Sequence, residues 1–393
     1  MFDKQLKVPA DLKDLQDTIK KARAEGSKVV LKENIVLNKV SRDEQAVIID
    51  LENFSEISEL DKENFTVKVQ GGINFLHFQT RLADLGFYFP MDTYASRQTS
   101  LTYNVLHGLL SYSLGAYGNY REYVLGMEAV LFNGEIIKLG GKNIKNVSGL
   151  DIMGLLVASK ETLGIMTSLT LRLLPLPEEK RVLIIDFPGA DSALQALAEI
   201  REKGINPAKL LFVRSQDHRL FPELNLPGTG IQVIVEIEGF KEAVPRRVTL
   251  LKEIALDKYQ GTVKAEVAAP DGIRKLWQGV REFQYSAVIQ EGQEILYSSS
   301  FSKLAALALE LEDLLAGHKH LMLQINGNTG TGTIILPKAA GSGVKKDIYK
   351  AVETAGGKIF NKNRAVKGLD SIGNKLRKAF DPSGISFWAG EER

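Results

Sequence analysis

The stretch that decides the fold is GGKNIKNVSGLD at residues 140–151, which continues through ASKETLGIMT at 158–167 into LRLLP at 171–175. Its turn residues alternate with short apolar segments, a pattern typical of strands joined by turns. Two prolines, Pro175 and Pro177, close the stretch. We therefore expect a first domain to end at about residue 177.

Helices and short strands alternate before that point. Residues 12–22 carry apolar side chains at helical spacing, and Asp11 ahead of them is a suitable N-cap. Short strands are expected at 29–31, 46–51 and 66–70, and a second helix at 75–85. The alternation predicts an α+β domain.

Beyond the proline pair, the rhythm becomes strand–helix–strand–strand–helix. Strands are expected at 182–187, 210–214 and 231–239, and helices at 190–203 and 241–256. This order favours an antiparallel sheet backed by helices. The glycine-rich run at 327–332 has neither a following lysine nor a helix start, so it predicts a hairpin turn and not a phosphate loop.

Length and composition limit the possible classes of protein. At 393 residues the chain exceeds the roughly 250–300 residues of a single hydrophobic core, so two domains are expected. Lys plus Arg (50) balance Asp plus Glu (48), which gives no charge signature of a nucleic-acid binder. The chain has no cysteine, which excludes disulfides, thiolate nucleophiles and cysteine-ligated clusters of its own.

The sequence also carries no membrane or secretion signal. Residues 1–7 lack the apolar core of a secretory signal, and no uninterrupted apolar run approaches the roughly 18–20 residues of a membrane span. These features predict a cytoplasmic protein with no direct membrane span. Attachment to the inner membrane face would have to run through partner subunits.

The opening stretch resembles the flavin-domain signature of the FAD-linked oxidases, the family of glycolate oxidase and D-lactate dehydrogenase. The family text is close to GGKxxKNVxGYD and then GSxGTLGIIT; here Leu150 replaces the tyrosine and Glu161 replaces a glycine. Residues 375–385, KLRKAFDPSGI, resemble the family's terminal LKxxFDPxGI. The resemblance implies a two-domain α+β fold of the PCMH type. Its parts would be a flavin domain at 1–177, a cap or substrate domain at 178–370, and a C-terminal tail at 371–393 that returns to the flavin domain.

The resemblance implies FAD as the cofactor. The family holds the pyrophosphate with backbone N–H groups of two glycine-rich loops, because glycine lets the main chain approach closely. The first loop aligns with LKENIVL at 31–37, which has no glycine and contains Glu33, whose charge would oppose a phosphate. The second aligns with SLTYNV at 100–105, where Thr102 and Tyr103 stand at the paired glycines.

Other FAD contacts of the family align with segments of this sequence that match the family motif more closely. Residues 117–126, YGNYREYVLG, match the run after the second loop, and 146–167 would supply main-chain contacts to the adenine and ribose. The candidate cofactor-binding residues are Thr99, Ser100, Asn104, Gly108, Tyr117, Gly118, Asn146, Gly149, Asp151, Leu163, Gly164 and Ile165. Two interpretations stay open: FAD binds through altered loops, or these segments preserve packing after FAD has been lost.

Catalysis requires a base that the sequence does not identify. Dehydrogenation of a 2-hydroxy acid passes a hydride to the flavin while a base, usually histidine, takes the hydroxyl proton. His107 is the one histidine in a predicted flavin loop, and a packing role is its other interpretation. Active relatives carry HAGDGNLH in the cap domain, where it can hold a metal; residues 324–330 read QINGNTG and lack both histidines. We assign no catalytic residue and predict no metal site.

The resemblance therefore implies the FAD-binding-type subunit of a glycolate or D-lactate dehydrogenase complex. Because the chain has no cysteine, electrons would leave through partners, namely a paralogous catalytic flavin subunit and an iron–sulfur subunit. The alternative is a flavin-free structural subunit that keeps the fold to scaffold those partners. No nucleic-acid partner is expected.

Overall fold

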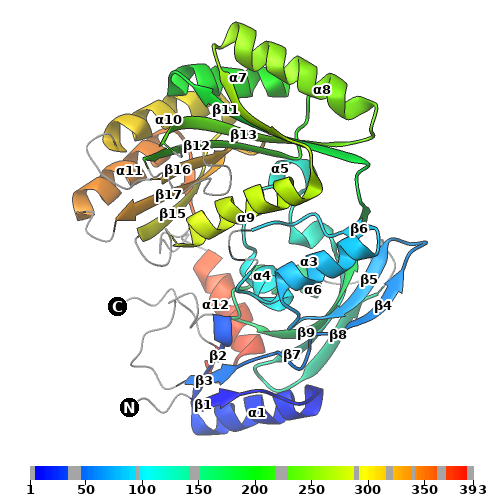
Figure 1. Cartoon of the computed structure of the whole chain (residues 1–393). Helices are drawn as coiled ribbons and strands as arrows, with labels where there is room; N and C mark the ends of the chain where they lie inside the picture. The colour runs from blue at the N-terminus through cyan, green and yellow to red at the C-terminus, as the bar shows by residue number, and fades with distance from the viewer. Residues whose placement is uncertain are drawn as a thin grey trace. The chain divides into compact units, whose positions relative to one another are not determined.

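The computed structural model describes residues 5–33, 46–93, 95, 97–141, 151–216, 229–286, 292–315, 322–337, 341–360 and 369–386. The chain divides into two compact units (Figure 1). The first contains Met1–Leu110, Asn119–Leu176 and Asn363–Arg393, and the second contains Ser111–Gly118 and Pro177–Lys362. The short segment 111–118 thus packs with the second unit although its sequence neighbours belong to the first.

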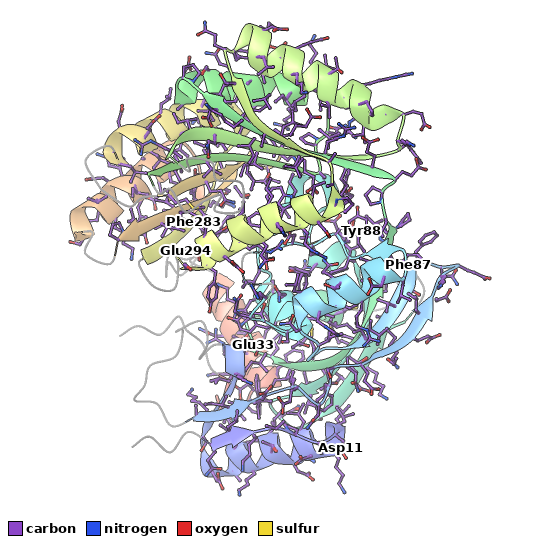
Figure 2. All side chains as sticks on the ribbon, viewed as in Figure 1. Asp11, Glu33, Phe87, Tyr88, Phe283 and Glu294 are labelled. Carbon is purple, nitrogen blue, oxygen red and sulfur yellow. The ribbon has the colours of Figure 1, made fainter. Side chains whose placement is uncertain are left out.

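A small parallel sheet opens the first unit. Its strands lie in the order β1 (Gln5–Lys7), β3 (Ala46–Ile49) and β2 (Lys28–Leu31). The first predicted helix is confirmed as α1 (Leu12–Glu25), which begins where Asp11 Oδ1 accepts the Asp14 N–H at 2.9 Å (Figure 2). Gly26 ends the helix in the left-handed region (φ 68°), which glycine adopts without strain.

The C-terminal segment also reaches this sheet. It follows α12 (Leu369–Phe380), and Asp381 accepts the N–H groups of Ile385 and Ser386 at 3.0 and 2.8 Å. Val29 of β2 then donates its N–H to the Ile385 carbonyl at 2.8 Å. The FDPSGI sequence is therefore a turn that attaches the C-terminal segment to β2.

An antiparallel sheet forms the rest of the first unit's framework. Its order is β4 (Ile57–Asp61), β5 (Thr66–Gln70), β9 (Gly164–Arg172), β7 (Val124–Leu131) and β8 (Ile136–Gly140). The central strand, β9, buries Leu169 and Leu171, and the latter pairs with Val67 of β5. Further elements are α3 (Phe75–Asp84), the pair β6 (Phe87–Tyr88) with β10 (Leu174–Pro175), α4 (Leu101–His107), η1 (Tyr120–Glu122) and α6 (Ile152–Leu156).

The second unit is built on an eight-stranded sheet, and its antiparallel pairing agrees with the prediction from sequence. Its order is β14 (Thr262–Val267), β11 (Glu179–Phe187), β13 (Thr229–Gly239), β12 (Lys209–Gln216), β16 (Met322–Asn326), β17 (Thr331–Pro337), β15 (Gly292–Ser298) and β18 (Lys358–Ile359). The run at 327–332 is confirmed as the turn between β16 and β17, where Gly330 has φ 71°. The second unit also includes α5 (Leu114–Tyr117), which lies in segment 111–118.

Helices cover both faces of this sheet (Figure 1). One face packs against α7 (Ala190–Glu202), α8 (Ala243–Lys252), α10 (Phe301–Leu315) and α11 (Ser342–Thr354), and the other against α9 (Pro270–Ser286). The helix predicted at 241–256 changes after Lys252 into a π-helical turn, Glu253–Lys258.

Tyr297 of β15 is fully buried in the larger of these two cores, and its hydroxyl has no hydrogen-bond partner among the residues that the structure describes. We expect Tyr297→Phe to raise the free energy of unfolding by about 1–3 kcal/mol, because it removes an unsatisfied buried hydroxyl and keeps the ring. Urea denaturation measures the change.

The matched control for this change is Tyr259→Phe. The Tyr259 hydroxyl donates to Glu199 Oε2 at 2.8 Å, so its removal should bring no gain in stability. A clear loss of stability in Tyr297→Phe would contradict the prediction.

Candidate functional site

The segment aligned with the second glycine loop forms a helix, α4, not an open loop. Ser100 caps it, because its side-chain oxygen accepts the Tyr103 N–H at 3.2 Å. Thr102 and Tyr103, which stand at the paired glycines, have no exposed surface. Thr102 Oγ1 donates to the Met166 carbonyl at 2.7 Å, and Gly71 leaves room for it, since a Cβ at Gly71 would lie 1.9 Å from that oxygen.

The residues predicted as cofactor contacts in this segment form hydrogen bonds around the start of α4. The Asn104 amide donates to Thr99 Oγ1 and to the Ser100 carbonyl, both at 2.7 Å, and accepts from Thr93 Oγ1 at 3.1 Å. Thr99 Oγ1 in turn donates to the Ala95 carbonyl at 2.7 Å. These side chains are buried, and their hydrogen bonds lie within the fold.

The segment aligned with the first glycine loop places a carboxylate at the cap of α4. Glu33 lies two residues after the end of β2, and its Oε1 accepts the Ser100 backbone N–H at 2.9 Å (Figure 2). The neighbouring Lys32 pairs with Asp50 at the end of β3. Residues 34–37 of the aligned segment lie outside the described part of the chain.

A strained loop brings a second carboxylate to the same place. Ala158, Lys160 and Glu161 all have positive φ (62°, 53° and 60°), a region that costs residues with a Cβ about 1–2 kcal/mol each. Glu161 stands where the family has glycine, and its side chain is 2% exposed. Its Oε2 accepts the Leu31 backbone N–H at 3.1 Å, and its Oε1 lies 2.7 Å from His107 Nε2.

In this structure His107 stacks on Tyr103 and contacts Glu161. Its ring stacks on Tyr103 with centroids 4.0 Å apart and planes 23° apart. The ring and Glu161 form an ion pair whenever the imidazole is protonated. The backbone N–H groups of Ala158 and Lys160 donate to carbonyls of α4 at 3.0 and 2.7 Å, so the loop is attached to the helix that carries His107.

The pKa of Glu33 is affected by its burial and by the nearby carboxylate of Glu161. Burial raises the pKa of the Glu33 carboxyl above its ordinary value, and the nearby charge of Glu161 raises it further. The hydrogen bonds from Ser100 act in the opposite direction, because they favour the charged form. Burial is the largest of these effects.

Two further candidates have structural roles beside this site. Gly108 ends α4 with φ 56°, and a Cβ there would lie 2.7 Å from that of Ala158. Asp151 caps α6, since its Oδ1 accepts the Gly154 N–H at 2.7 Å. Both positions keep neighbouring segments in contact.

The remaining candidates are dispersed. Leu163, Gly164 and Ile165 lie at the start of β9, after the strained loop, and all three are buried. Tyr117 and Gly118 belong to the second unit, where the Tyr117 hydroxyl pairs with Glu238. Asn146 and Gly149 fall outside the residues that the structure describes. The structure thus brings together Thr99, Ser100, Asn104 and Gly108 around α4.

The sequence alone does not indicate the structural role of Glu33 or Glu161, although both positions stand out in the comparison with the family motif. Glu33 was recognised as opposing a phosphate, and Glu161 as replacing a glycine. Their partners, the N–H groups of Ser100 and Leu31, are 67 and 130 residues away in sequence. The available signals were an acid in the segment aligned with the first phosphate loop and an acid at a glycine position of segment 158–167.

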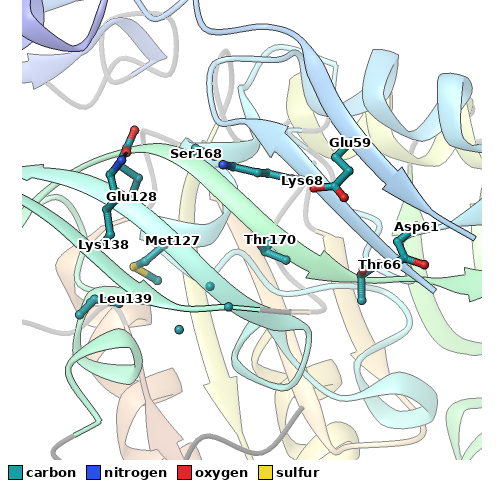
Figure 3. A pocket seen from close by; sticks show the side chains of 13 residues that line it. Glu59, Asp61, Thr66, Lys68, Met127, Glu128, Lys138, Leu139, Ser168 and Thr170 are labelled. Atoms are coloured by element: carbon teal, nitrogen blue, oxygen red, sulfur yellow. Dashed lines mark ion pairs between the residues drawn. The ribbon is translucent and has the colours of Figure 1, made fainter. Parts of the chain in front are cut away.

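A shallow hollow of about 280 Å³ lies on the five-stranded sheet (Figure 3). Side chains of all five strands line it, and Lys138 and Glu128 form an ion pair beside it at 2.8 Å. The Lys138 side chain is 76% exposed. The hollow has the character of a solvated sheet face.

The described residues of the second unit, which corresponds to the predicted cap domain, contain no cluster of metal ligands. Among the residues with assigned positions, no group of three or more His, Cys, Asp or Glu side chains could hold a metal ion. On β16, Gln324 and Asn326 are buried in the segment where active relatives have histidines. Asn326 Nδ2 donates to the Tyr112 carbonyl at 3.0 Å, which ties β16 to segment 111–118.

Comparisons with known proteins agree with this architecture. Residues 4–140 match the family model of an FAD binding domain, and residues 176–368 match that of the C-terminal domain of FAD linked oxidases. Glycolate oxidase subunit GlcD of Bacillus subtilis is 28% identical over 81% of this chain and 68% of its own length. A D-lactate dehydrogenase of Archaeoglobus fulgidus is 29% identical over 57% of this chain and 51% of its own length.

A solved structure with a similar fold is alkyldihydroxyacetonephosphate synthase, with a TM-score of 0.77 at 16% identity over 97% of this chain and 75% of that one. The folds are therefore alike over nearly the whole chain. With the two matched models, this defines a two-domain flavin-oxidase architecture. The chain belongs to the FAD-linked oxidase family.

FAD is the cofactor of that family, but the described residues do not fit it in the family's usual pose. A pyrophosphate between β2 and α4 would need backbone N–H groups, and those of Leu31 and Ser100 are bonded to carboxylates of the chain itself. It would also meet the negative charges of Glu33 and Glu161. The side chains of Thr102 and Tyr103 fill the places of the paired glycines.

No helix within the described ranges is both long and apolar enough to cross a membrane.

The raised pKa of Glu33 predicts a pH-dependent stability. Below its ordinary value of 4.5 the carboxyl is protonated in both folded and unfolded chains and contributes no pH dependence. As the pH rises through the window above 4.5, the unfolded chain ionises first, so the folded state loses stability relative to a chain without this acid. Lys32 and Glu161 are the charged groups that face it.

We therefore expect Glu33→Gln, which keeps an acceptor for the Ser100 N–H, to gain melting temperature relative to the parent as the pH rises from about 4 to 7. Thermal unfolding across that range measures it. Glu63→Gln, at an exposed turn position, is the control and should show no such trend. A difference between parent and Glu33→Gln that is constant with pH would contradict the assignment.

Proposed function

We propose that this chain is a non-catalytic subunit of a 2-hydroxy-acid dehydrogenase complex that acts on glycolate or D-lactate. The names of its relatives support the reaction class, because they include glycolate oxidase subunit GlcD, D-lactate dehydrogenases and D-2-hydroxyglutarate dehydrogenases. The chain spans between about half and two thirds of the length of the first of these relatives.

The observation that carries this proposal is the pairing of His107 with Glu161. The imidazole that sequence placed in a flavin loop stacks on a buried tyrosine and contacts a buried carboxylate. On the cap unit, Gln324 and Asn326 offer amides, which cannot accept a hydroxyl proton at neutral pH. We therefore assign no catalytic base to this chain alone.

Electron transfer in such a complex would use partner subunits. The chain has no cysteine to ligate an iron–sulfur cluster, so we infer a paralogous catalytic flavin subunit and an iron–sulfur subunit as partners. The name of the GlcD relative, which is called a subunit, supports assembly into a complex. We place this complex in the cytoplasm, with any attachment to the inner membrane face made by the partners.

The test is turnover with and without partners. The isolated chain should not reduce an artificial electron acceptor with glycolate or D-lactate, because the proposal assigns it no base. Coexpression with a paralogous flavin subunit and an iron–sulfur subunit should give a complex that copurifies and turns over. Robust turnover by the isolated chain would contradict the proposal, and so would an active complex from which this chain is absent at equal yield.

A further inference from the structure

We propose that Glu33 and Glu161 form an internal carboxylate pair in the place of the FAD pyrophosphate, so that the chain folds as a flavin-free member of its family. This inference concerns the chain's own cofactor, goes beyond the proposed function, and does not depend on the substrate. It rests on the two backbone N–H groups that the carboxylates occupy.

The two N–H groups come from the two segments that align with the family's phosphate loops. Leu31 ends β2, and its N–H reaches Glu161 Oε2 at 3.1 Å. Ser100 precedes α4, and its N–H reaches Glu33 Oε1 at 2.9 Å. Each carboxylate comes from a different segment than the N–H it binds, so the two bonds connect β2, α4 and the 158–161 loop. A carboxylate oxygen is an anionic acceptor, as a phosphate oxygen is, and satisfies the same kind of donor.

The pair also resists replacement by a ligand. A pyrophosphate that bound these N–H groups would have to break both hydrogen bonds and leave two buried or partly buried acids without their donors. It would carry its own negative charges toward them in a site where burial already raises the pKa of Glu33. Binding of FAD in the family's usual pose is therefore unfavourable, because it breaks two hydrogen bonds and brings like charges together.

Backbone strain indicates that Glu161 is held for its side chain. Its φ of 60° suits glycine, which the family has at this position, yet the chain places a 2%-exposed glutamate there. His107 supplies a partner for the buried carboxylate at 2.7 Å, and the Tyr103 ring supports His107 by stacking. Tyr103 itself stands at one of the family's paired glycines, so two departures from the family pattern, Glu161 and Tyr103, meet in one cluster.

The first experiment uses the full chain without substitutions. The protein is purified, incubated with excess FAD, freed of unbound ligand by gel filtration, and assayed for flavin absorbance and for a shift in melting temperature. We expect no retained flavin and no shift. Retention of one FAD per chain would overturn the proposal. Because this experiment does not measure turnover, a failure of the flavin-free proposal can be distinguished from a failure of the proposed function.

The second experiment opens the site. Glu33→Ala with Glu161→Gly frees both N–H groups, restores glycine at the strained position and leaves His107 available to an anion. Inorganic pyrophosphate is the probe, and it should raise the melting temperature of this double variant but not of the parent, since a ligand that binds only the folded state stabilises it. Glu63→Ala, which removes an exposed charge from the same unit, is the control and should respond like the parent.

Absence of a pyrophosphate shift in the folded double variant would overturn the proposal, as would equal shifts in variant and parent. If the double variant does not fold, Glu33→Ala alone is tested in the same way, because it frees the Ser100 N–H and leaves the Glu161–His107 contact in place. A shift in that variant alone supports the proposal, and no shift contradicts it.

Discussion

Two backbone N–H groups of the first unit, those of Leu31 and Ser100, are bonded to carboxylates of the same chain. Each bond joins segments that are far apart in sequence, and together they attach the end of β2 to the start of α4 and to the loop before β9. The strained backbone at Glu161 persists because the surrounding structure uses its side chain twice, once for Leu31 and once for His107. The form of the site follows from these contacts.

The contacts also explain how a flavin-domain fold can persist without the loops that hold the flavin. In a family member with FAD, the ligand would satisfy the main-chain donors of the two loops; under our proposal the acids take this role here. The paired glycines are then no longer required, and Thr102 and Tyr103 become buried parts of a helix.

The sequence predicted the framework better than the site. The cap at Asp11, the alternation around β5 and the strand rhythm of the second unit are local patterns, and the corresponding elements are found. The α4 segment was aligned with an open loop, but side chains at the glycine positions favoured burial in a helix. The bond from Leu31 to Glu161 spans 130 residues, and no local pattern encodes it. That segment 111–118 belongs to the second unit likewise depends on tertiary packing and not on a local sequence pattern.

The most direct test of the central claim is a crystal structure of the full chain grown with excess FAD. The account predicts electron density for Glu33 Oε1 within hydrogen-bond distance of the Ser100 nitrogen, for Glu161 between Leu31 and His107, and no density for a dinucleotide between β2 and α4. Density for a pyrophosphate on the Leu31 and Ser100 nitrogens, with both carboxylates turned away, would contradict it.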